Sequence, residues 1–140
     1  MITKKTEYAI KALWELSNRD DNLTTSKEIA QRQSIPPKYL PQIIAALSQA
    51  GLLTSIRGYG GGLRLSRSPE EISILDIIEA IQGKPRLFEC QLGSCDCIHQ
   101  PNCELRFIYN RAQTALEHVF RETKLSDVNF NIPCVRGKNA

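Results

Sequence analysis

Four of the five cysteines of the chain lie close together, between residues 90 and 103. Closely spaced thiols can form disulfides, react with oxidants, or bind a metal ion or an iron–sulfur cluster as thiolates. The N-terminus holds no apolar stretch of signal-peptide length, and no apolar run approaches the roughly 20 residues that span a bilayer. We therefore expect a cytoplasmic protein that does not enter a membrane, and whose cysteines are metal ligands or redox thiols rather than structural disulfides.

The spacing of these cysteines leaves more than one chemistry open. Four sulfurs, or three sulfurs and His99, would satisfy a tetrahedral zinc site. Cys95 and Cys97 are separated by a single residue, however, which is not the spacing of a zinc ribbon. Zinc is therefore the competitor of an iron–sulfur cluster, and oxidation of Cys95 and Cys97 as reactive thiols is a further alternative. Cys134, which is alone near the C-terminus, is expected to be a free thiol.

The two halves of the chain differ in charge, although the net charge is only +3. Residues 1–67 hold ten Lys and Arg against five Asp and Glu, a balance of +5. Residues 68–140 hold eight against ten, a balance of −2. A basic first half is typical of a module that binds a polyanion and is joined to a part that does not.

Apolar periodicity and turn residues predict a winged helix-turn-helix that is mainly α with a small β wing. The expected elements are a helix over residues 5–18, a helix from Thr25 to about Gln33, a turn over Ser34–Pro37, a helix ending near Ala50, strands Leu52–Ile56 and Leu63–Ser66, a Ser73-capped helix over Ile74–Gln82, and a long helix from Glu104 to Leu125. We divide the chain into a DNA-binding domain over 1–83, a cysteine-rich cluster-binding loop over 84–103, a dimerisation helix over 104–128 and a flexible tail over 129–140.

Two local signals set the start of the second and third helices. Thr25 and Glu28 have the spacing of a capping box. Pro41 must lie in the first turn of the third helix, because proline lacks the N–H that an interior position donates. Either regular helix begins only around Lys38–Leu40, or the segment opens with a short irregular turn.

A helix that enters the major groove of DNA offers its N-terminal side chains to the base edges. Gln42 can bond to adenine through two atoms, and Lys38 suits a phosphate. The glycines at the tip of the wing let its backbone approach DNA, although they can equally form only a mobile turn. The candidate DNA-binding residues are Thr25, Lys27, Pro37, Lys38, Tyr39 and Gln42, together with Arg57, Tyr59, Gly60, Gly61 and Arg64 of the wing.

The chain resembles the IscR/NsrR (Rrf-two) family of iron–sulfur transcription regulators over about residues 1–125. The resemblance rests on Ile29–Ile35, Tyr39-Leu40, Gln42, Leu47, Ala50–Leu52, Arg57–Leu63, Lys5–Ala9 and Ile74–Gly83, with the helix-turn-helix, the glycine wing and the cysteine loop in order. It implies a homodimeric repressor or activator with one cluster per subunit, of the 2Fe–2S or 4Fe–4S type, that senses redox state, iron or nitric oxide. Where some members have a glutamate that tunes base selection, this chain has Pro41, so their operator preference is not expected here.

The same resemblance implies a ligand set of three cysteines. Cys90, Cys97 and Cys103 fit the family spacing best, and Cys95 is an alternative ligand. Some relatives use a histidine three residues after the last cysteine, but that position is Arg106, which cannot bind a cation. Others borrow an acidic residue from the first helix of the partner subunit, and Glu7 occupies that place. Within the loop His99 and Cys95 remain possible fourth ligands, and Glu7 can instead form a surface ion pair with Lys11.

We expect double-stranded DNA with a palindromic operator as the partner, and a homodimer. The amphipathic helix after the cysteines suits packing between subunits, and on the first helix Ile10 and Trp14 form an extra apolar pair that suggests a second contact. We expect no small-molecule substrate and no enzyme activity, because no nucleophile, base and acid stand out together. The alternative is a DNA-binding regulator without a functional cluster, controlled by thiol oxidation, zinc or a protein partner.

Overall fold

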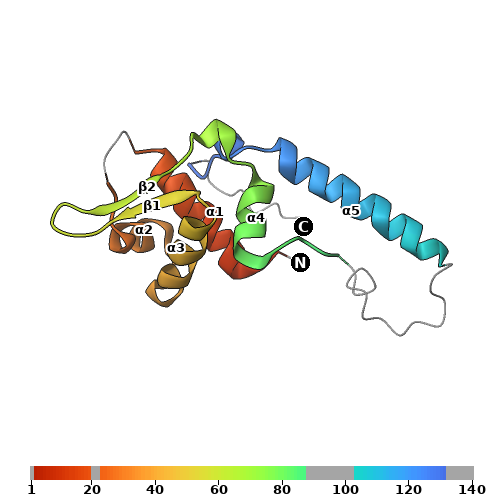
Figure 1. The fold of residues 1–140 in the computed structure, drawn as a ribbon, viewed down its shortest axis with the longest axis horizontal. Coiled ribbons are helices and arrows are strands. Elements are labelled where there is room, and N and C mark those ends of the chain that lie inside the picture. The colour runs from red at the N-terminus through yellow and green to blue at the C-terminus, as the bar shows by residue number, and fades with distance from the viewer. Residues whose placement is uncertain (1, 20–22, 88–102, 132–140) are drawn as a thin grey trace, which may run out of the picture.

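The protein has a helical module with a two-stranded wing, from which one long helix projects (Figure 1). The structure is a computed structural model that describes residues 2–19, 23–87 and 103–131. Its elements are α1 (Lys4–Ser17), α2 (Ser26–Gln33), the 3-10 turn η1 (Pro37–Tyr39), α3 (Leu40–Gln49), β1 (Leu53–Ile56), β2 (Gly62–Leu65), the 3-10 turn η2 (Pro69–Glu71), α4 (Ile74–Gln82), α5 (Glu104–Glu122) and the 3-10 turn η4 (Leu125–Asp127). The fold class predicted from the sequence is confirmed. None of the helices in these ranges is both long and apolar enough to cross a membrane.

Side-chain caps start the predicted helices. The hydroxyl of Thr25 accepts the N–H of Glu28 at 3.2 Å, so the threonine half of the expected capping box is present at α2. At α4 the box is complete, because Ser73 accepts the N–H of Asp76 while Asp76 accepts the N–H of Ser73, each at 3.0 Å. These caps satisfy backbone donors that have no partner within the first turn of a helix.

The irregular start of the third helix is the 3-10 turn η1. It places Pro41 in the first turn of α3, as the chemistry of proline requires. Of the two starts that the sequence allowed, the short irregular turn is the one formed. At the other end Gly51 has a φ of 75°, and the N–H of Leu52 donates to the carbonyl of Leu47 at 2.9 Å. A glycine here ends the helix because it tolerates a left-handed conformation.

The wing is an antiparallel hairpin held at its base by a third segment. In its register Leu53 lies opposite Leu65, and Ile56 lies opposite Gly62. Thr24 forms an isolated bridge with Leu63, in which their N–H groups donate to each other's carbonyls at 3.1 and 2.8 Å. The sequence did not predict this bridge, which joins the wing to the residues just before α2.

The core lies where α1, α3 and α4 pack together. Leu13, Ile43 and Ile77, one from each helix, are fully buried. α4 also buries Ile74, Leu75 and Ile78, which agrees with the prediction of a helix covered on most sides. Burial of these large aliphatic side chains supplies most of the stabilisation of the module.

The long helix α5 ends at Glu122, earlier than the boundaries at 125 and 128 that were expected. The chain then turns back onto the module, where the N–H of Ile74 donates to the carbonyl of Thr123 at 2.9 Å. The N–H of Leu125 donates to the carbonyl of Ile72 at 2.8 Å, and the Leu125 side chain is fully buried. The helix ends here because continuing it would keep Leu125 out of the core.

The chain after η4 packs on α1, which corrects two expectations. The indole N–H of Trp14 donates to the carbonyl of Val128 at 2.9 Å, and the Phe130 ring meets the Trp14 ring edge-on at 5.3 Å. Residues 129–131 are therefore not a free tail, because Phe130 has an aromatic partner. Trp14 is covered by its own chain rather than left for a partner subunit. Residues 132–140, with Cys134, lie outside the described residues.

Candidate nucleic-acid interface

The recognition segment, defined here as residues 37–49, has one face in the core and one in solvent. Leu40, Ile43 and Leu47 are buried and fasten it to the module. Lys38 and Gln42 are exposed, on the side of the segment that faces away from the core. Pro37, Pro41, Ala45 and Gln49 are exposed as well. The start of the segment therefore presents the ammonium group of Lys38 and the amide of Gln42 beside small or apolar neighbours, which suits a phosphate and a base edge.

Tyr39 holds the start of the recognition segment against α1. Its half-buried ring lies 5.7 Å from the ring of Tyr8 at an angle of 36°. The ammonium of Lys38 lies 5.1 Å from the Tyr39 ring centre, in range for a cation–π contact. Tyr39 is thus less available to a base than Lys38 or Gln42, and its ring orients the Lys38 side chain.

The two α2 candidates differ in how free they are. Lys27 is exposed in the first turn of α2 and can approach a phosphate. Thr25 is exposed too, but its hydroxyl already caps the helix. A helix N-terminus with an exposed lysine is a suitable contact for a phosphate, and here the cap and the contact share one turn.

The wing candidates lie on an exposed loop whose shape depends on glycine. Tyr59 at the tip is entirely exposed, and Arg57 and Arg64 are also exposed. Gly60 has a φ of 77°, and a Cβ on Gly61 would lie 2.1 Å from the carbonyl oxygen of Ile56. These glycines therefore have defined conformational roles in the described hairpin. The loop carries Arg57 and Tyr59 away from the module, where a wing can reach DNA.

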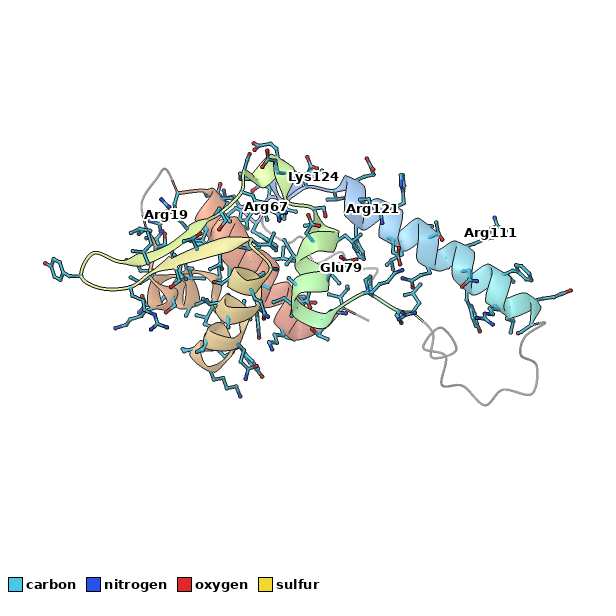
Figure 2. All side chains as sticks on the ribbon, in the orientation of Figure 1. Arg19, Arg67, Glu79, Arg111, Arg121 and Lys124 are labelled. Carbon is cyan, nitrogen blue, oxygen red and sulfur yellow. The ribbon has the colours of Figure 1, made fainter. Side chains whose placement is uncertain are left out.

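Two arginines beside the wing were missed by the sequence-based list. Arg19 and Arg67 border an open polar hollow together with Arg64. Figure 2 shows Arg19 and Arg67 near the base of the hairpin. The excess of basic residues before residue 68 was the available signal, but charge counting does not tell which arginines converge. Arg19 is partly compensated by an ion pair with Glu15 at 3.4 Å.

Cys103 is the candidate cysteine ligand that lies within the described residues. It is a free, half-buried cysteine at the N-cap of α5, and its side chain makes no capping hydrogen bond. Its thiol is therefore available as a ligand. Cys90, Cys95, Cys97 and His99 lie outside the described residues. Within the described ranges no three His, Cys, Asp or Glu side chains gather where they could hold a metal ion.

Glu7, the proposed ligand from the partner, is exposed and paired with a different lysine from the one considered in the sequence. Its carboxylate lies 3.0 Å from the ammonium of Lys4, one turn earlier in α1, rather than pairing with Lys11. The hydrogen bond to Glu7 and then its charge raise the pKa of Lys4. An exposed ion pair of this kind contributes little to stability, so Glu7 can exchange this partner for another.

The first residues of the cysteine segment, defined here as residues 84–103, contact α5. The side-chain amide of Gln113 accepts the N–H of Leu87 at 3.2 Å and donates to the carbonyl of Pro85. Lys84 lies 3.8 Å from the carboxylate of Glu117 on the same helix. The residues that enter the cysteine segment thus have contacts with the middle of α5, and Cys103 occupies the N-cap position before its first turn.

Comparison with known proteins points to one family. The family model Rrf2, described as an iron-dependent transcriptional regulator, matches residues 2–130. The regulator NsrR of Bacillus licheniformis is 33% identical over 137 residues, covering 96% of each chain.

Solved structures share the fold. CymR, described as the global cysteine regulator of B. subtilis, has a TM-score of 0.77 at 28% identity and covers 95% of this chain and 98% of its own. IscR from T. potens has a TM-score of 0.73 at 27% identity and covers 91% of this chain and 84% of its own. The exposed helix-turn-helix and wing agree with these similarities. The chain belongs to the Rrf2 family of DNA-binding transcriptional regulators and is not an enzyme.

Proposed function

We propose that the protein is a homodimeric transcription regulator whose affinity for a palindromic operator is modulated by an iron–sulfur cluster. The observation that carries this proposal is the position of Cys103. It stands at the N-cap position of a long helix whose large apolar side chains are exposed, so a ligand and a candidate subunit interface lie on one element. Such a regulator acts in the cytoplasm, with redox state, iron or nitric oxide as its signal.

A second copy of the chain is the occupant that we propose for the exposed face of α5. None of the 19 residues of this helix is buried, although Leu105, Phe107, Ile108 and Val119 are large and apolar. Most of the stability of a helix in a protein comes from packing of its apolar face, and a projecting helix without a partner lacks this packing. Pairing with the same helix of another copy covers both faces at once, as in a two-fold symmetric interface.

The proposed cluster is bound by Cys90, Cys97 and Cys103, with Cys95 as the alternative ligand, and there is one cluster per subunit. The iron atoms of 2Fe–2S and 4Fe–4S clusters are bound by thiolates, which these cysteines would supply. Glu7 of the partner subunit is the proposed fourth ligand. Within one chain α1 and the Cys103 end of α5 lie well apart (Figure 1). A cluster bound by both Glu7 and Cys103 would therefore take these two ligands from different subunits.

DNA binding is proposed to use the recognition segment in the major groove and the wing beside it. Gln42 reads a base, Lys38 and Lys27 contact phosphates, and Arg57 with Tyr59 approaches the minor groove. Two copies related by a two-fold axis would read half-sites about 34–36 Å apart, or a multiple of this distance. Changes at the cluster would reach DNA through the contacts between the cysteine segment and α5, which alter the spacing of the two recognition segments.

The test is anaerobic purification followed by operator-binding measurements with the cluster present and removed. We expect a visible absorption band typical of a thiolate-bound cluster, and a change of about tenfold or more in operator affinity on cluster loss. Cys103→Ser should abolish the band and the change in affinity, whereas the matched control Cys134→Ser should keep both. Operator affinity that is indifferent to the presence of a bound cluster would overturn the proposal.

A second candidate is a regulator of the same fold without a functional cluster. The similarity to CymR, whose description names cysteine rather than iron, favours it. In this case thiol oxidation, zinc or a protein partner would control DNA binding. Anaerobic protein without a visible band, whose operator affinity changes on mild oxidation or zinc removal, would support this candidate over the first.

A further inference from the structure

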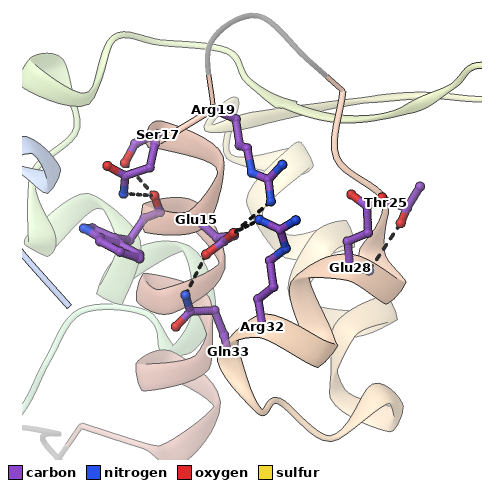
Figure 3. Close-up of polar contacts among 9 residues, drawn as sticks. Glu15, Ser17, Arg19, Thr25, Glu28, Arg32 and Gln33 are labelled. Carbon is purple, nitrogen blue, oxygen red and sulfur yellow. Dashed lines mark hydrogen bonds and ion pairs between the residues drawn. The ribbon is translucent and has the colours of Figure 1, made fainter. Parts of the chain in front are cut away.

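Glu15 is an almost buried carboxylate held by three side chains. Its side chain is only 10% exposed. One carboxylate oxygen lies 3.4 Å from the guanidinium of Arg19 and 3.4 Å from that of Arg32 (Figure 3). The other accepts the side-chain N–H of Gln33 at 2.7 Å (Figure 3). A buried carboxylate is costly unless it is paired and hydrogen-bonded, so this arrangement has to be satisfied in the folded protein.

Two of these three contacts cross from α1 to the end of α2. Arg32 and Gln33 are the last two residues of α2, and Ser34 follows in a left-handed conformation with a φ of 53°. The recognition segment begins three residues after Ser34. Glu15 therefore binds α2 at the turn that determines where the recognition segment points.

Within α2 itself, few buried side chains determine how the helix is rotated on α1. This helix has eight residues and buries only Ile29 and Ala30. Two small or aliphatic side chains leave rotation about the helix axis weakly defined, because apolar contacts are not directional. The hydrogen bond from Gln33 and the ion pair with Arg32 are directional, and both meet the same carboxylate.

We propose that Glu15 is a positioning residue for base recognition: it fixes the last turn of α2 on α1 and thereby sets the orientation of the recognition segment. Hydrogen bonds to base edges need close alignment, whereas contacts with phosphates tolerate small shifts. Loss of Glu15 should therefore lower discrimination between sequences more than it lowers binding to DNA in general.

The test compares Glu15→Gln, Gln33→Ala and the double variant with the wild-type chain. An operator duplex is first selected from a random library with the wild-type protein, and affinities are measured for it and for a random duplex at one salt concentration. The selection tests sequence-specific binding itself, so its failure is distinguishable from failure of the role of Glu15. Gln33→Ala leaves the charge of the protein unchanged, and Glu79→Gln, at an exposed position on α4, is the matched control for removal of a carboxylate.

We expect each single variant to lose about tenfold in operator affinity while binding to the random duplex changes by less than about threefold. The double variant should lose less than the sum of the two single losses, because the side chains at positions 15 and 33 contact each other. The control should bind as the wild type does. Additive losses, equal losses on both duplexes, or full operator affinity in folded variants would overturn the proposal. Folding is checked by thermal unfolding, and if Glu15→Gln does not fold, Gln33→Ala alone decides between these outcomes.

Discussion

Among the glycines of the wing, Gly61 has the strongest steric reason to lack a side chain. A Cβ at this position would lie 2.1 Å from the carbonyl oxygen of Ile56 and 2.9 Å from that of Gly58. Both neighbours are backbone atoms, so neither can move aside without reshaping the loop. The Gly61 N–H also donates to the Gly58 carbonyl at 3.0 Å, which closes the turn.

We predict that Gly61→Ala opens the wing and lowers DNA affinity by about tenfold, because the loop then presents Arg57 and Tyr59 at another angle. The free energy of unfolding should change by only about 1 kcal/mol, since the loop is exposed. Fluorescence anisotropy with a labelled duplex and thermal unfolding measure the two effects. Tyr59→Ala is the comparison that removes one of the proposed wing contacts without reshaping the backbone. Wild-type affinity in Gly61→Ala would show that the shape of the wing has no part in binding.

Among the described residues, Ser34 is the non-glycine residue with a left-handed backbone conformation, at φ 53° and ψ 42°. This conformation costs a residue with a Cβ roughly 1–2 kcal/mol. We predict that Ser34→Gly leaves stability unchanged or raises it by up to about 1 kcal/mol, and that Ser34→Val lowers it by about 1–2 kcal/mol. Urea unfolding measures both. Equal effects of the two substitutions would mean that the turn changes its conformation to accommodate them.

Single-residue chemistry was predictable where a local rule constrained it. The proline rule placed Pro41 in a first turn, and cap spacing placed Thr25 before α2. The ion pair of Glu7 was predicted with the wrong lysine, because positions three before and four after it are both in reach on a helix. The contacts of Glu15 with α2 gave no sequence signal, since Arg32 and Gln33 are 17 and 18 residues away along the chain.

At the scale of elements, α1 is the attachment point for the chain that leaves α5. Trp14 binds Val128 through its N–H and contacts Phe130 through its ring. The neighbouring Glu15 binds the end of α2, and an open hollow is lined both by Phe130 and by Gln33. One turn of α1 thus carries contacts to the C-terminal segment and to the helix-turn-helix.

We predict that Trp14→Phe loosens residues 128–131, because phenylalanine keeps an aromatic ring but has no N–H for the Val128 carbonyl. Loss of this hydrogen bond should cost about 1 kcal/mol and speed amide hydrogen exchange in the segment after η4. Mass-spectrometric exchange measures the second effect. Phe130→Leu is the matched comparison, since it removes the ring contact and leaves the Trp14 donor. Unchanged exchange in Trp14→Phe would contradict an anchoring role for the indole N–H.

The helices and the hairpin were predictable from apolar periodicity, but the contacts between distant segments were not. Pairing of Thr24 with Leu63 involves a single residue outside any strand pattern, so alternation could not reveal it. The end of α5 was expected too late for a similar reason. No proline or glycine interrupts the chain between Glu104 and Leu125, yet Leu125 enters the core because residues 72–74 bind the backbone around it.

At the scale of the whole molecule, the exposed side chains of the projecting helix α5 are available for assembly but are not part of the core that stabilises the module. Phe107 is 72% exposed and Ile108 is 57% exposed, and neither belongs to the core. The labelled Arg111 also extends from α5 into solvent (Figure 2). Substitutions on this helix should therefore change association without unfolding the module, a separation that buried core positions do not allow.

We predict that Phe107→Glu with Ile108→Glu yields a folded monomer, because buried unpaired carboxylates oppose pairing of two α5 helices. Sedimentation should show half the wild-type mass, with thermal unfolding of the module retained. Operator affinity should fall by about 100-fold or more, since the two half-sites are then bound independently rather than by one linked dimer. Ser126→Glu, which adds a single carboxylate at an exposed position beyond α5, should remain dimeric. If the α5 variant also stays dimeric and binds the operator fully, the subunits associate through another surface, and the proposed ligation by Glu7 across the interface loses its geometric basis.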